Sequence, residues 1–399
     1  MSKINDLIKE LCPNGVEYVK LEELVDYIQP AKYIVKNTNY DIKYDVPVLT
    51  AGQTFILGYT NEKDGIYYAS ADNPVIIFDD FTTSNHWVDF NFKVKSSAMK
   101  ILISKTDNLF KYIYYCISNI DYVPKEHSRQ WIQVYSQFQI PLPPLKVQEE
   151  IVRILDKFGE LEEELEAELE ARKSQYEFWR GKVFDAKGKT KTYKLEEVLE
   201  SLKTGLNPRK FFRLNTEDAD GYYVTVREIG DRNVRYWESK DRVNKDGLLR
   251  INERANLEIG DVIFSGTGTI GRVSLIEETP DNWNVKEGVY ILKPKKEIIN
   301  PVYLMHLMRS DYMKKLYSDY IVGNPVSSVP MRDLKNVKFE LPDLDTQEKI
   351  SNILDKFDRL VNDITVGLPA EIELRRKQYR YYRNKLLDFE EIDHEFIAE

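Results

Sequence analysis

One stretch of the sequence is written twice, and this internal repeat constrains the fold more than any other feature. Residues 142–151 read LPPLKVQEEI and residues 341–350 read LPDLDTQEKI, and both continue into ILDKF at 154–158 and 353–357. The offset between the copies is 199 residues here and 203 at the loosely matching pair Gln175 and Gln378, so about one helical turn has been gained near 366–369. A repeat must be interpreted first, because it determines how the domains are organised.

Each copy predicts a long helix, because its apolar residues recur three or four positions apart. Pro143 and Pro144 exclude a helix before the first copy, and Asp345 with Glu348 predicts a capping box at the start of the second. Pro369 should kink the second helix or split it. The apolar stripe is narrow and the opposite face is charged, so each helix needs one helical partner. The residues expected to pack the helix pair are Ile154, Phe158, Leu161, Leu165, Leu169, Tyr176, Leu354, Phe357, Val361, Ile364, Leu368, Ile372 and Tyr379.

The chain length between the helices predicts how they pair. A helix over 146–184 would be roughly 58 Å long, whereas the roughly 160 residues that follow would form a domain with a radius of gyration of only about 15 Å. The second helix must therefore start near the end of the first and fold back along it to bury both stripes. We expect a mixed α/β (α+β) protein with two globular domains joined by two long antiparallel coiled-coil helices and an approximate two-fold axis.

The expected boundaries are a first domain at 1–145, a central spacer helix at 146–186, a second domain at 187–345, a distal spacer helix at 346–388 and an acidic tail at 389–399. Short strands are predicted at 46–50, 74–78, 222–226, 261–264 and 288–292, and helices at 108–120 and 301–316. The sequence KLEEL at 20–24 is repeated as KLEEV at 194–198. The order of elements is shared while the residues between them differ, which indicates one scaffold used twice with different surfaces.

Composition narrows the class of protein. The chain has 399 residues and two cysteines, Cys12 and Cys116, with no secretory segment at the start and no apolar run long enough to span a bilayer. We therefore expect a cytoplasmic protein with reduced thiols, no membrane association and no metal site. The net charge is −9, but residues 1–145 carry 14 basic and 17 acidic groups and residues 187–345 carry 27 and 25. Domains this close to neutral neither establish nor exclude DNA binding.

The motifs that suggest an enzyme do not form a coherent active site. Residues 266–271, GTGTIG, match a dinucleotide-binding fingerprint, but residues 272–276 read as a returning strand, so no helix is predicted to meet a pyrophosphate. A β-turn is expected there instead. His86, His127, His306 and His394 are scattered, with His306 on a helix face that is expected to pack. No catalytic residue is predicted.

The repeated segments carry a family resemblance. The pairing of LPPL and QE with ILDKF, followed by LEAELEARK at 165–173, resembles the central spacer of type I restriction-modification specificity subunits. Residues 361–383, with RKQYRYYR at 376–383, resemble the distal spacer of that family. These regions cover about a fifth of the chain, and the domains resemble the family only in their order: target-recognition domain, spacer, target-recognition domain, spacer.

The resemblance implies a non-catalytic subunit that reads a bipartite, asymmetric sequence in double-stranded DNA. Each domain would read one half-site, with the antiparallel helices acting as a ruler and as a docking surface for two methyltransferase (modification) subunits. Restriction subunits with motor activity would complete the complex. The resemblance places S-adenosylmethionine, ATP and magnesium in those partner subunits and none of them in this chain. Half-sites about one helical turn of DNA apart, roughly 34 Å, agree with domains separated by a long helix.

DNA readout requires exposed side chains that bond base edges and donors that contact phosphate. Polar turns supply such groups in both predicted domains, although a solvated loop residue is an equally good interpretation of any one of them. Trp131 and Tyr176 are expected to pack rather than to stack on bases. The candidate DNA-binding residues are Gln53, Thr82, Thr83, Ser84, Asn85, His127, Arg129, Gln130, Arg209, Lys210, Arg227, Thr267, Thr269, Arg272, Asn324 and Ser327.

Two other functions agree with parts of the sequence. One is a coiled-coil structural adaptor that binds no nucleic acid, which the near-neutral domains favour. The other is an enzyme fused to a coiled coil, which the missing active site disfavours. Strong salt dependence of duplex binding would separate the DNA-binding hypothesis from the adaptor.

Overall fold

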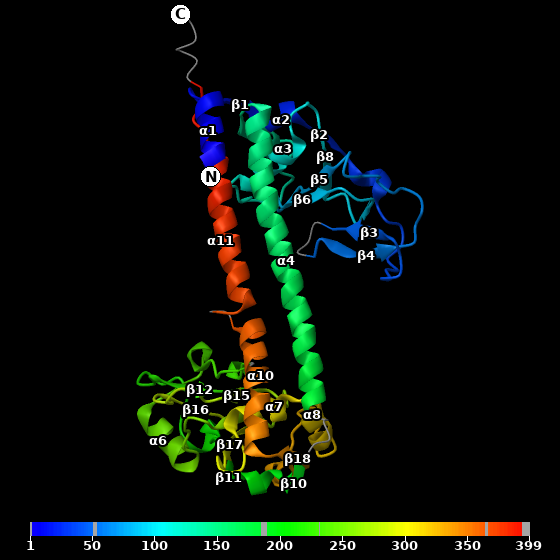
Figure 1. The fold of residues 1–399 in the computed structure, drawn as a ribbon. Coiled ribbons are helices and arrows are strands. Elements are labelled where there is room, and N and C mark those ends of the chain that lie inside the picture. The colour runs from blue at the N-terminus through cyan, green and yellow to red at the C-terminus, as the bar shows by residue number, and fades with distance from the viewer. Residues whose placement is uncertain (1, 51–53, 185–189, 231, 364–365, 393–399) are drawn as a thin grey trace, which may run out of the picture. The chain divides into compact units, whose positions relative to one another are not determined.

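The computed structural model describes residues 2–50, 54–184, 190–230, 232–363 and 366–392 (Figure 1). The chain divides into two compact units. The first unit comprises Met1–Glu163 and Leu374–Glu399, and the second comprises Glu164–Glu373. The globular part of each unit is called below the first domain and the second domain. The long helix α4 (Leu145–Val183) contributes its beginning to the first unit and its end to the second.

The described strands of the first domain form three sheets. β1 (Glu17–Lys20) pairs antiparallel with β9 (Gln139–Leu142). A four-stranded antiparallel sheet has the order β2 (Val25–Ile28), β8 (Met99–Ser104), β5 (Val75–Asp79) and β6 (Asn85–Val88). A three-stranded sheet has the order β4 (Ile56–Thr60), β3 (Val46–Leu49) and β7 (Lys93–Val94). The other elements are α1 (Ser2–Leu11), α2 (Leu21–Leu24), η1 (Pro30–Tyr33), α3 (Phe110–Asn119) and η2 (Tyr135–Gln137).

The described strands of the second domain form sheets of the same sizes. β10 (Thr190–Lys194) pairs antiparallel with β18 (Lys338–Pro342). The four-stranded sheet has the order β11 (Leu199–Thr204), β17 (Val289–Pro294), β14 (Val262–Ser265) and β15 (Val273–Leu275), and the three-stranded sheet has the order β13 (Arg242–Val243), β12 (Gly221–Val224) and β16 (Trp283–Val285). The shorter elements are η3 (Leu195–Val198), α5 (Pro208–Phe211), η4 (Val226–Glu228), η5 (Tyr236–Glu238), α6 (Lys245–Arg254), α7 (Pro301–Arg309), α8 (Asp311–Ser318) and α9 (Met331–Lys335).

The two domains share one topology. In each, the central strands of the four-stranded sheet are buried apolar runs, with every residue of β5 and of β14 buried. In each three-stranded sheet the middle strand has one antiparallel and one parallel neighbour. The turn between β5 and β6 is therefore equivalent to the turn between β14 and β15. The expectation of one scaffold used twice is confirmed at the level of sheet order and strand direction.

A repeated glutamine explains part of the sequence repeat. Nε2 of Gln148 donates to the Pro143 carbonyl at 2.8 Å, and its Oε1 accepts from the backbone of Leu109, just before α3. Gln347 in the second unit repeats this, with Nε2 donating to the Pro342 carbonyl at 2.8 Å and Oε1 accepting from the backbone of Asn300, just before α7. Both side chains are buried. Each therefore ties the start of a spacer helix to the start of its domain's own helix.

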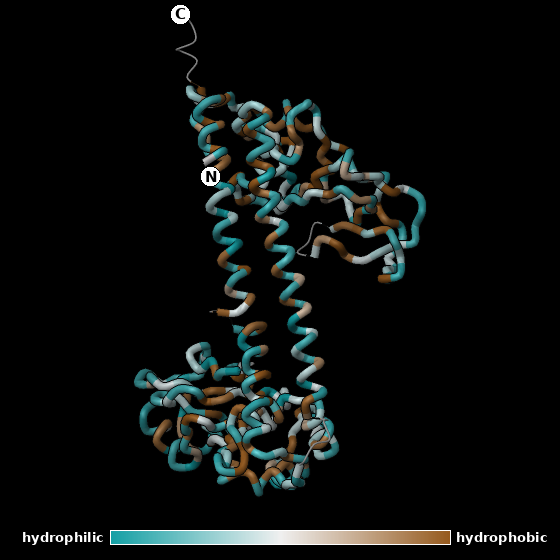
Figure 2. The backbone as a smooth tube through the Cα atoms, in the orientation of Figure 1, coloured by the Kyte–Doolittle hydropathy of each residue, from teal (hydrophilic) through white to brown (hydrophobic). Residues whose placement is uncertain are grey.

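The first spacer helix begins directly after Pro144, as predicted, and Figure 2 shows hydrophobic and hydrophilic residues alternating along it. The second is two helices, α10 (Leu344–Asn362) and α11 (Leu368–Leu386), with Pro369 in the first turn of α11. The prediction that Pro369 kinks or splits the distal spacer helix is confirmed, because the spacer expected over 346–388 consists of two helices. The cap of α10 also differs, because Asp343, rather than Asp345, accepts a hydrogen bond from the backbone of Thr346 at 2.8 Å.

Each unit packs α4 antiparallel against part of the second spacer. In the first unit the ring of Phe158 lies 6.3 Å from that of Tyr379 on α11, and Glu162 pairs with Arg376 at 2.6 Å. In the second unit the ring of Tyr176 lies 6.5 Å from that of Phe357 on α10. Phe158 and Phe357 are equivalent in the repeat, and so are Tyr176 and Tyr379. The same aromatic contact is therefore made once in each unit, with the roles of the two helices exchanged.

The residues expected to pack the helix pair divide into three groups. The buried residues are Tyr176, Leu354, Val361, Leu368 and Ile372, and the half-buried ones are Ile154, Phe158, Leu161, Leu165, Leu169, Phe357 and Tyr379. Leu354 and Val361 belong to the core cluster of the second domain, because α10 also packs on α7. In the first copy Leu155 is fully buried in the core of the first domain, whereas Ile154, which was expected to be buried, is half-buried. The buried face of α4 is therefore shifted by one residue from the predicted stripe. Ile364 lies outside the described residues.

The other element predictions hold with one change. Strands lie at or within one or two residues of every predicted range, and α3 covers most of 108–120. The single helix expected over 301–316 is instead α7 and α8, because the Ser310 hydroxyl accepts from the backbone of Met313 at 3.1 Å and starts a new helix. Trp131 and Tyr176 are buried, as expected.

Candidate functional site

The two polar segments predicted in the first domain lie side by side at one end of its four-stranded sheet. Residues 80–84 form the turn between β5 and β6, and the backbone NH groups of Gln130 and Trp131 donate to Asp80, to its carbonyl and carboxylate respectively, each at 2.8 Å. The ring of His127 stacks on Phe81 with centroids 4.7 Å apart. Thr82, Ser84, His127 and Arg129 are exposed there and Asn85 is half-buried. The structure thus brings four of the predicted residues of this domain, Thr82, Ser84, His127 and Arg129, into one surface.

Two of these predicted residues are not available for base readout. Gln130 is buried, accepts from the Tyr122 hydroxyl at 2.8 Å and donates to the Ser128 carbonyl at 2.8 Å. Thr83 is also buried and has a φ of 63°, and its hydroxyl donates to the Thr82 carbonyl. Both side chains shape the turn and its neighbouring loop, which corrects their expected exposure. Gln53 lies outside the described residues.

A charged pair is buried beneath this surface. Nζ of Lys100 lies 3.5 Å from Oδ2 of Asp80, and both side chains are almost fully buried. Burial lowers the pKa of Lys100, an effect that Asp80 opposes. Because Asp80 also holds the loop at 130–131 through its backbone and side chain, the pair fixes the turn to the sheet.

The equivalent place in the second domain also combines a turn with a loop. The turn between β14 and β15 contains Thr267 and Thr269, and the loop at 322–329 runs beside it. The backbone NH of Gly268 donates to the Ser327 carbonyl at 2.8 Å, and that of Val329 donates to the Gly266 carbonyl at 2.9 Å. Thr269 and Asn324 are exposed, and Thr267 and Ser327 are half-buried. Turn and loop are held together by backbone pairing, which leaves side chains free for contact with a ligand.

The turn adjoins a groove with a volume of about 660 Å³. Its lining joins residues far apart in the sequence: Asn207 and Arg209 at the start of α5, Arg227 in η4, Thr267 in the turn, and Val326 in the loop. Three of the predicted DNA-binding residues, Arg209, Arg227 and Thr267, therefore meet at one cavity. Lys210, Thr269, Asn324 and Ser327 are not part of its lining, and Arg272 lines a neighbouring cavity instead.

Local structure positions the two arginines of the groove. The side chain of Asn207 accepts from the backbone of Arg209 at 3.1 Å and caps the short helix α5, with Pro208 at its first position. Arg227 donates to the Thr225 hydroxyl and to Asp241, each at 3.3 Å, while its side chain remains two-thirds exposed. Weak ion pairs at exposed positions leave such a guanidinium able to exchange its partner for a phosphate or a base edge.

The glycine motif is a hairpin turn, as predicted. β14 and β15 are antiparallel neighbours, and Gly268 and Gly271 have φ values of 80° and 92°. A side chain at Gly266 would overlap the ring of Tyr290. No helix begins after the motif, so it offers no helix N-terminus to a dinucleotide.

Sequence reasoning missed some of the groove. Lys286 lines it from the segment after β16, and Asp241 lines it beside Arg227. Neither has a sequence signal, because each reads as an ordinary charged residue between short strands. Lys286 reaches the groove because β16 pairs in parallel with β12, and Asp241 reaches it because β13 pairs antiparallel with β12.

Metal-ligating side chains are dispersed in the described part of the chain. No group of three or more His, Cys, Asp or Glu residues there has the arrangement of a metal site. His306 is fully buried, and burial with the nearby Arg309 lowers its pKa to about 3, so it serves as a packed neutral side chain. Among the described helices, none combines the length and the apolar character needed to cross a bilayer.

Comparison with known proteins agrees with the duplicated fold. The family model of the type I restriction modification DNA specificity domain matches residues 13–171 and again 187–374. The chain is 38% identical over 405 residues to the type I restriction enzyme EcoR124I/EcoR124II specificity subunit of Escherichia coli, and the match covers 98% of each chain. It is 27% identical to a putative type I restriction enzyme specificity subunit of Haemophilus influenzae, covering 96% of this chain and 98% of the relative.

Solved structures have the same fold. The specificity subunit of a type I restriction-modification system from M. genitalium aligns with a TM-score of 0.55 and 14% identity, covering 94% of this chain and 97% of that one. A chain from a structural study of assembly and conformational transition in the type I system aligns with a TM-score of 0.56 and 15% identity, covering 94% and 98%. The family model matches the chain twice, a relative is 38% identical over almost the whole chain, and a solved specificity subunit has the same fold. This protein therefore belongs to the family of type I restriction-modification specificity subunits.

Proposed function

We propose that this chain is the sequence-reading subunit of a type I restriction-modification complex and binds a bipartite, asymmetric site in double-stranded DNA. The observation that carries the proposal is a turn-and-loop surface found at the equivalent place in each domain. Each surface lies on its domain's own four-stranded sheet, and the two surfaces bear different side chains. In the first domain this surface presents Thr82, Ser84, His127 and Arg129. In the second it presents Thr267, with Arg209 of α5 and Arg227 of η4 beside it around the groove. One scaffold with two unlike surfaces suits two unlike half-sites.

The domain assignment follows the spacers. Residues 1–145 and 187–345 are proposed as the two target-recognition domains, residues 146–186 and 346–388 as the central and distal spacers, and 389–399 as an acidic tail. The 39-residue length of α4 and the antiparallel contacts in each unit support a spacer that sets the gap between half-sites. The same helices are proposed to dock two methyltransferase subunits and, with them, the restriction subunits.

Chemistry is proposed to reside in those partners. Adenine methylation would use S-adenosylmethionine, and DNA translocation and cleavage would use ATP and magnesium, all bound by other chains. This chain is proposed to be non-catalytic and to act in the cytoplasm, where the DNA is. The neutral, packed His306 and the hairpin form of the glycine motif support that assignment.

The test begins with copurification of the tagged chain with adenine methyltransferase subunits. Methylated adenines are then mapped across host DNA in the presence and absence of the chain. The proposal predicts one split motif with a fixed gap and two different half-sites. Binding of a duplex that carries this motif should weaken steeply with salt.

The structural adaptor makes the opposite prediction. An adaptor would copurify with partners, yet the complex would show no salt-dependent duplex binding and methylation would not depend on this chain. A palindromic motif would contradict the assignment of one half-site to each of two unlike domains.

A further inference from the structure

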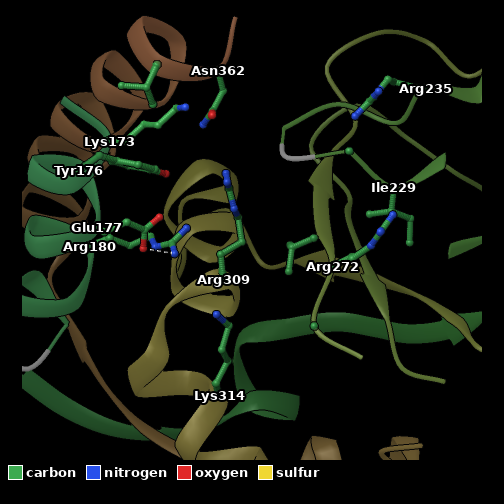
Figure 3. A pocket seen from close by; sticks show the side chains of 14 residues that line it. Lys173, Tyr176, Glu177, Arg180, Ile229, Arg235, Arg272, Arg309, Lys314 and Asn362 are labelled. Carbon is green, nitrogen blue, oxygen red and sulfur yellow. Dashed lines mark hydrogen bonds and ion pairs between the residues drawn. The ribbon is translucent and has the colours of Figure 1, made fainter. Parts of the chain in front are cut away.

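A second cavity in the second unit is strongly basic and lies outside the candidate groove. Its volume is about 570 Å³, and α4 lines it together with α7, α8, the end of α10, Arg235 just before η5 and Arg272 just before β15 (Figure 3). All of its lining residues belong to the second unit. The cavity is called below the basic pocket. Its six cationic residues are Lys173, Arg180, Arg235, Arg272, Arg309 and Lys314.

The charge of the basic pocket contrasts with that of the chain. Glu177 is the one carboxylate among its lining residues, and it is already paired with Arg180. The whole chain has a net charge of −9. Six cations gathered around one cavity repel one another and favour an anion between them.

The present partners of these cations leave them able to bind an anion. Lys173, Arg235 and Lys314 each pair with a carboxylate three residues away on the same short segment, at 2.8, 3.4 and 3.1 Å. Their side chains are about half exposed, and ion pairs at such positions contribute little to stability. A phosphate that contacts several of them at once would compete with these local pairs.

Arg309 and Arg272 are held in position by hydrogen bonds to protein groups outside the pocket lining. Nη1 of Arg309 donates to the buried Asp358 at 3.2 Å. Nη1 of Arg272 donates to the carbonyls of Val226 and Arg227 at 3.2 and 3.4 Å. A guanidinium has five donors, so each arginine keeps others for a ligand while its position is fixed.

The shape of the pocket favours a phosphate without a stacked base. Gly230 and Gly271 line it without side chains, so a ligand can approach the backbone. Tyr176 is the one aromatic residue in the lining, and its ring is contacted by Arg180 at 5.4 Å and stacked with Phe357 at 6.5 Å. No open ring face is therefore presented to a nucleobase by the described lining.

The turn between β14 and β15 lines both the basic pocket and the candidate groove. The turn between β14 and β15 contributes Thr267 and Gly268 to the groove and Gly271 and Arg272 to the pocket. Arg272 also bonds the backbone of Arg227, whose side chain lines the groove. A groove that reads bases needs phosphate donors beside it, since half or more of protein–DNA hydrogen bonds go to the backbone.

We infer that the basic pocket binds the DNA backbone next to the half-site read by the second domain, with the spacer helix α4 supplying Lys173 and Arg180. This inference rests on the proposed function and adds to it a direct contact between spacer and DNA. The spacer then both separates the domains and takes part in holding the duplex.

The experiment uses the complex of this chain with its methyltransferase subunits and a duplex that carries the mapped motif. One variant combines Lys173→Gln, Arg235→Gln and Lys314→Gln, which removes three exposed cations of the pocket. The control combines Lys157→Gln, Arg332→Gln and Lys338→Gln, three exposed cations outside it, so the change in net charge is the same. Binding is measured by fluorescence anisotropy over a range of salt concentrations.

The pocket variant should bind cognate and non-cognate duplexes more weakly by the same factor, on the order of tenfold. The slope of log affinity against log salt should fall by about 0.9 for each phosphate contact removed, with the control unchanged. The methylated motif should stay the same. Ethylation of phosphates beside the second half-site should block the wild-type complex and lose that effect in the pocket variant.

Three results would overturn the inference. Equal slopes for the pocket variant and the control, with specific binding by the wild type retained, would reject the pocket while leaving the proposed function intact. Pyrophosphate binding can be measured for the same two variants. If the pocket variant loses pyrophosphate binding while its slope of log DNA affinity against log salt is unchanged, the pocket binds a small free anion instead of DNA. Absence of any salt-dependent duplex binding by the wild-type complex would instead reject the proposed function, and the pocket's role with it.

Discussion

The hydroxyl of Tyr176 on α4 donates a 3.1 Å hydrogen bond to Oδ1 of Asp358 on α10, and both side chains are almost completely buried. Arg309 and Asn362 donate to the same carboxylate oxygen at 3.2 and 2.9 Å. A buried carboxylate with three donors joins the spacer helices of the second unit to α7 of its domain. Hydrogen bonds to a buried charge are strong, so the orientation of α10 on its domain depends on these contacts.

Tyr176→Phe should destabilise the second unit. The substitution keeps the ring and removes one hydrogen bond to a buried charged acceptor, which contributes about 1–3 kcal/mol. Arg309 and Asn362 remain, so we expect a loss near the lower end of that range. Urea denaturation monitored by circular dichroism measures it. Tyr381→Phe, at an exposed position on α11, is the matched control and should change stability little; equal effects of the two substitutions would contradict the role of Asp358.

His306 predicts a dependence of stability on pH. Burial, reinforced by Arg309, lowers its folded-state pKa to about 3 from 6.5. Below pH 6.5 the unfolded chain takes up a proton that the folded chain does not, so stability should fall as the pH falls from 6.5 towards 3. The slope reaches at most about 1.4 kcal/mol per pH unit for this residue. Besides Arg309, the charged groups that act on its ring are Asp355, Arg232 and Arg180.

The test compares wild type with His306→Gln between pH 6.5 and 5, above the range in which most carboxylates titrate. The variant should lose part of the pH dependence. Burial lowers the pKa of His86 as well, so some dependence of the same sign should remain from the first domain. Identical slopes for the two proteins would show that His306 is not held neutral.

The sequence repeat predicted the helices and their pairing because the two spacers make equivalent contacts, one set in each unit. Gln148 and Gln347 make equivalent hydrogen bonds, and the Phe158–Tyr379 contact is repeated by Phe357 and Tyr176. The break between α10 and α11 was also predictable, since Pro369 and the four extra residues mark it. The division into α7 and α8 was not predictable, because a serine inside an apolar helical pattern does not by itself indicate a new helix start. Ser310 acts as an N-cap here because α7 ends at Arg309.

The candidate site was less predictable than the helices. Arg209, Arg227 and Thr267 could be proposed as polar turn residues, but only the pairing of β12 with β16 and of β14 with β15 brings them to one groove. No sequence pattern indicated the basic pocket. Lys173 and Arg180 have acidic neighbours three residues away, which is the ordinary pattern of a solvated helix face, and Arg309 ends an apolar helix.

Arg227→Gln should alter recognition by the second domain alone. Its exposed guanidinium faces the groove, and a bidentate contact with a base contributes about 1–3 kcal/mol of discrimination. We expect weaker methylation with one relaxed position in one half-site and no change in the other. Lys245→Gln, at an exposed position of α6 outside the groove, should leave the motif unchanged. Changes in both half-sites would contradict the assignment of one half-site to each domain.

Changing the length of α4 tests the ruler directly. Insertion of four residues within 160–170 lengthens the helix by about 6 Å, or roughly two base pairs of DNA. This segment is suitable because its residues are exposed or half-buried and none is fully buried. The second copy already contains four residues more than the first between α10 and α11, so an added turn has a precedent in this chain. Methylation mapping should show a longer gap between two unchanged half-sites.

The control places the same four residues between the exposed Glu217 and Asp218 of the second domain, which should leave the gap as it was. A changed half-site in the helix variant would mean that α4 shapes the reading surface itself. An unchanged gap in a variant that still folds and methylates would mean that the spacing is set elsewhere, because a rigid helix of 1.5 Å rise per residue cannot absorb four residues without moving what is attached to its end.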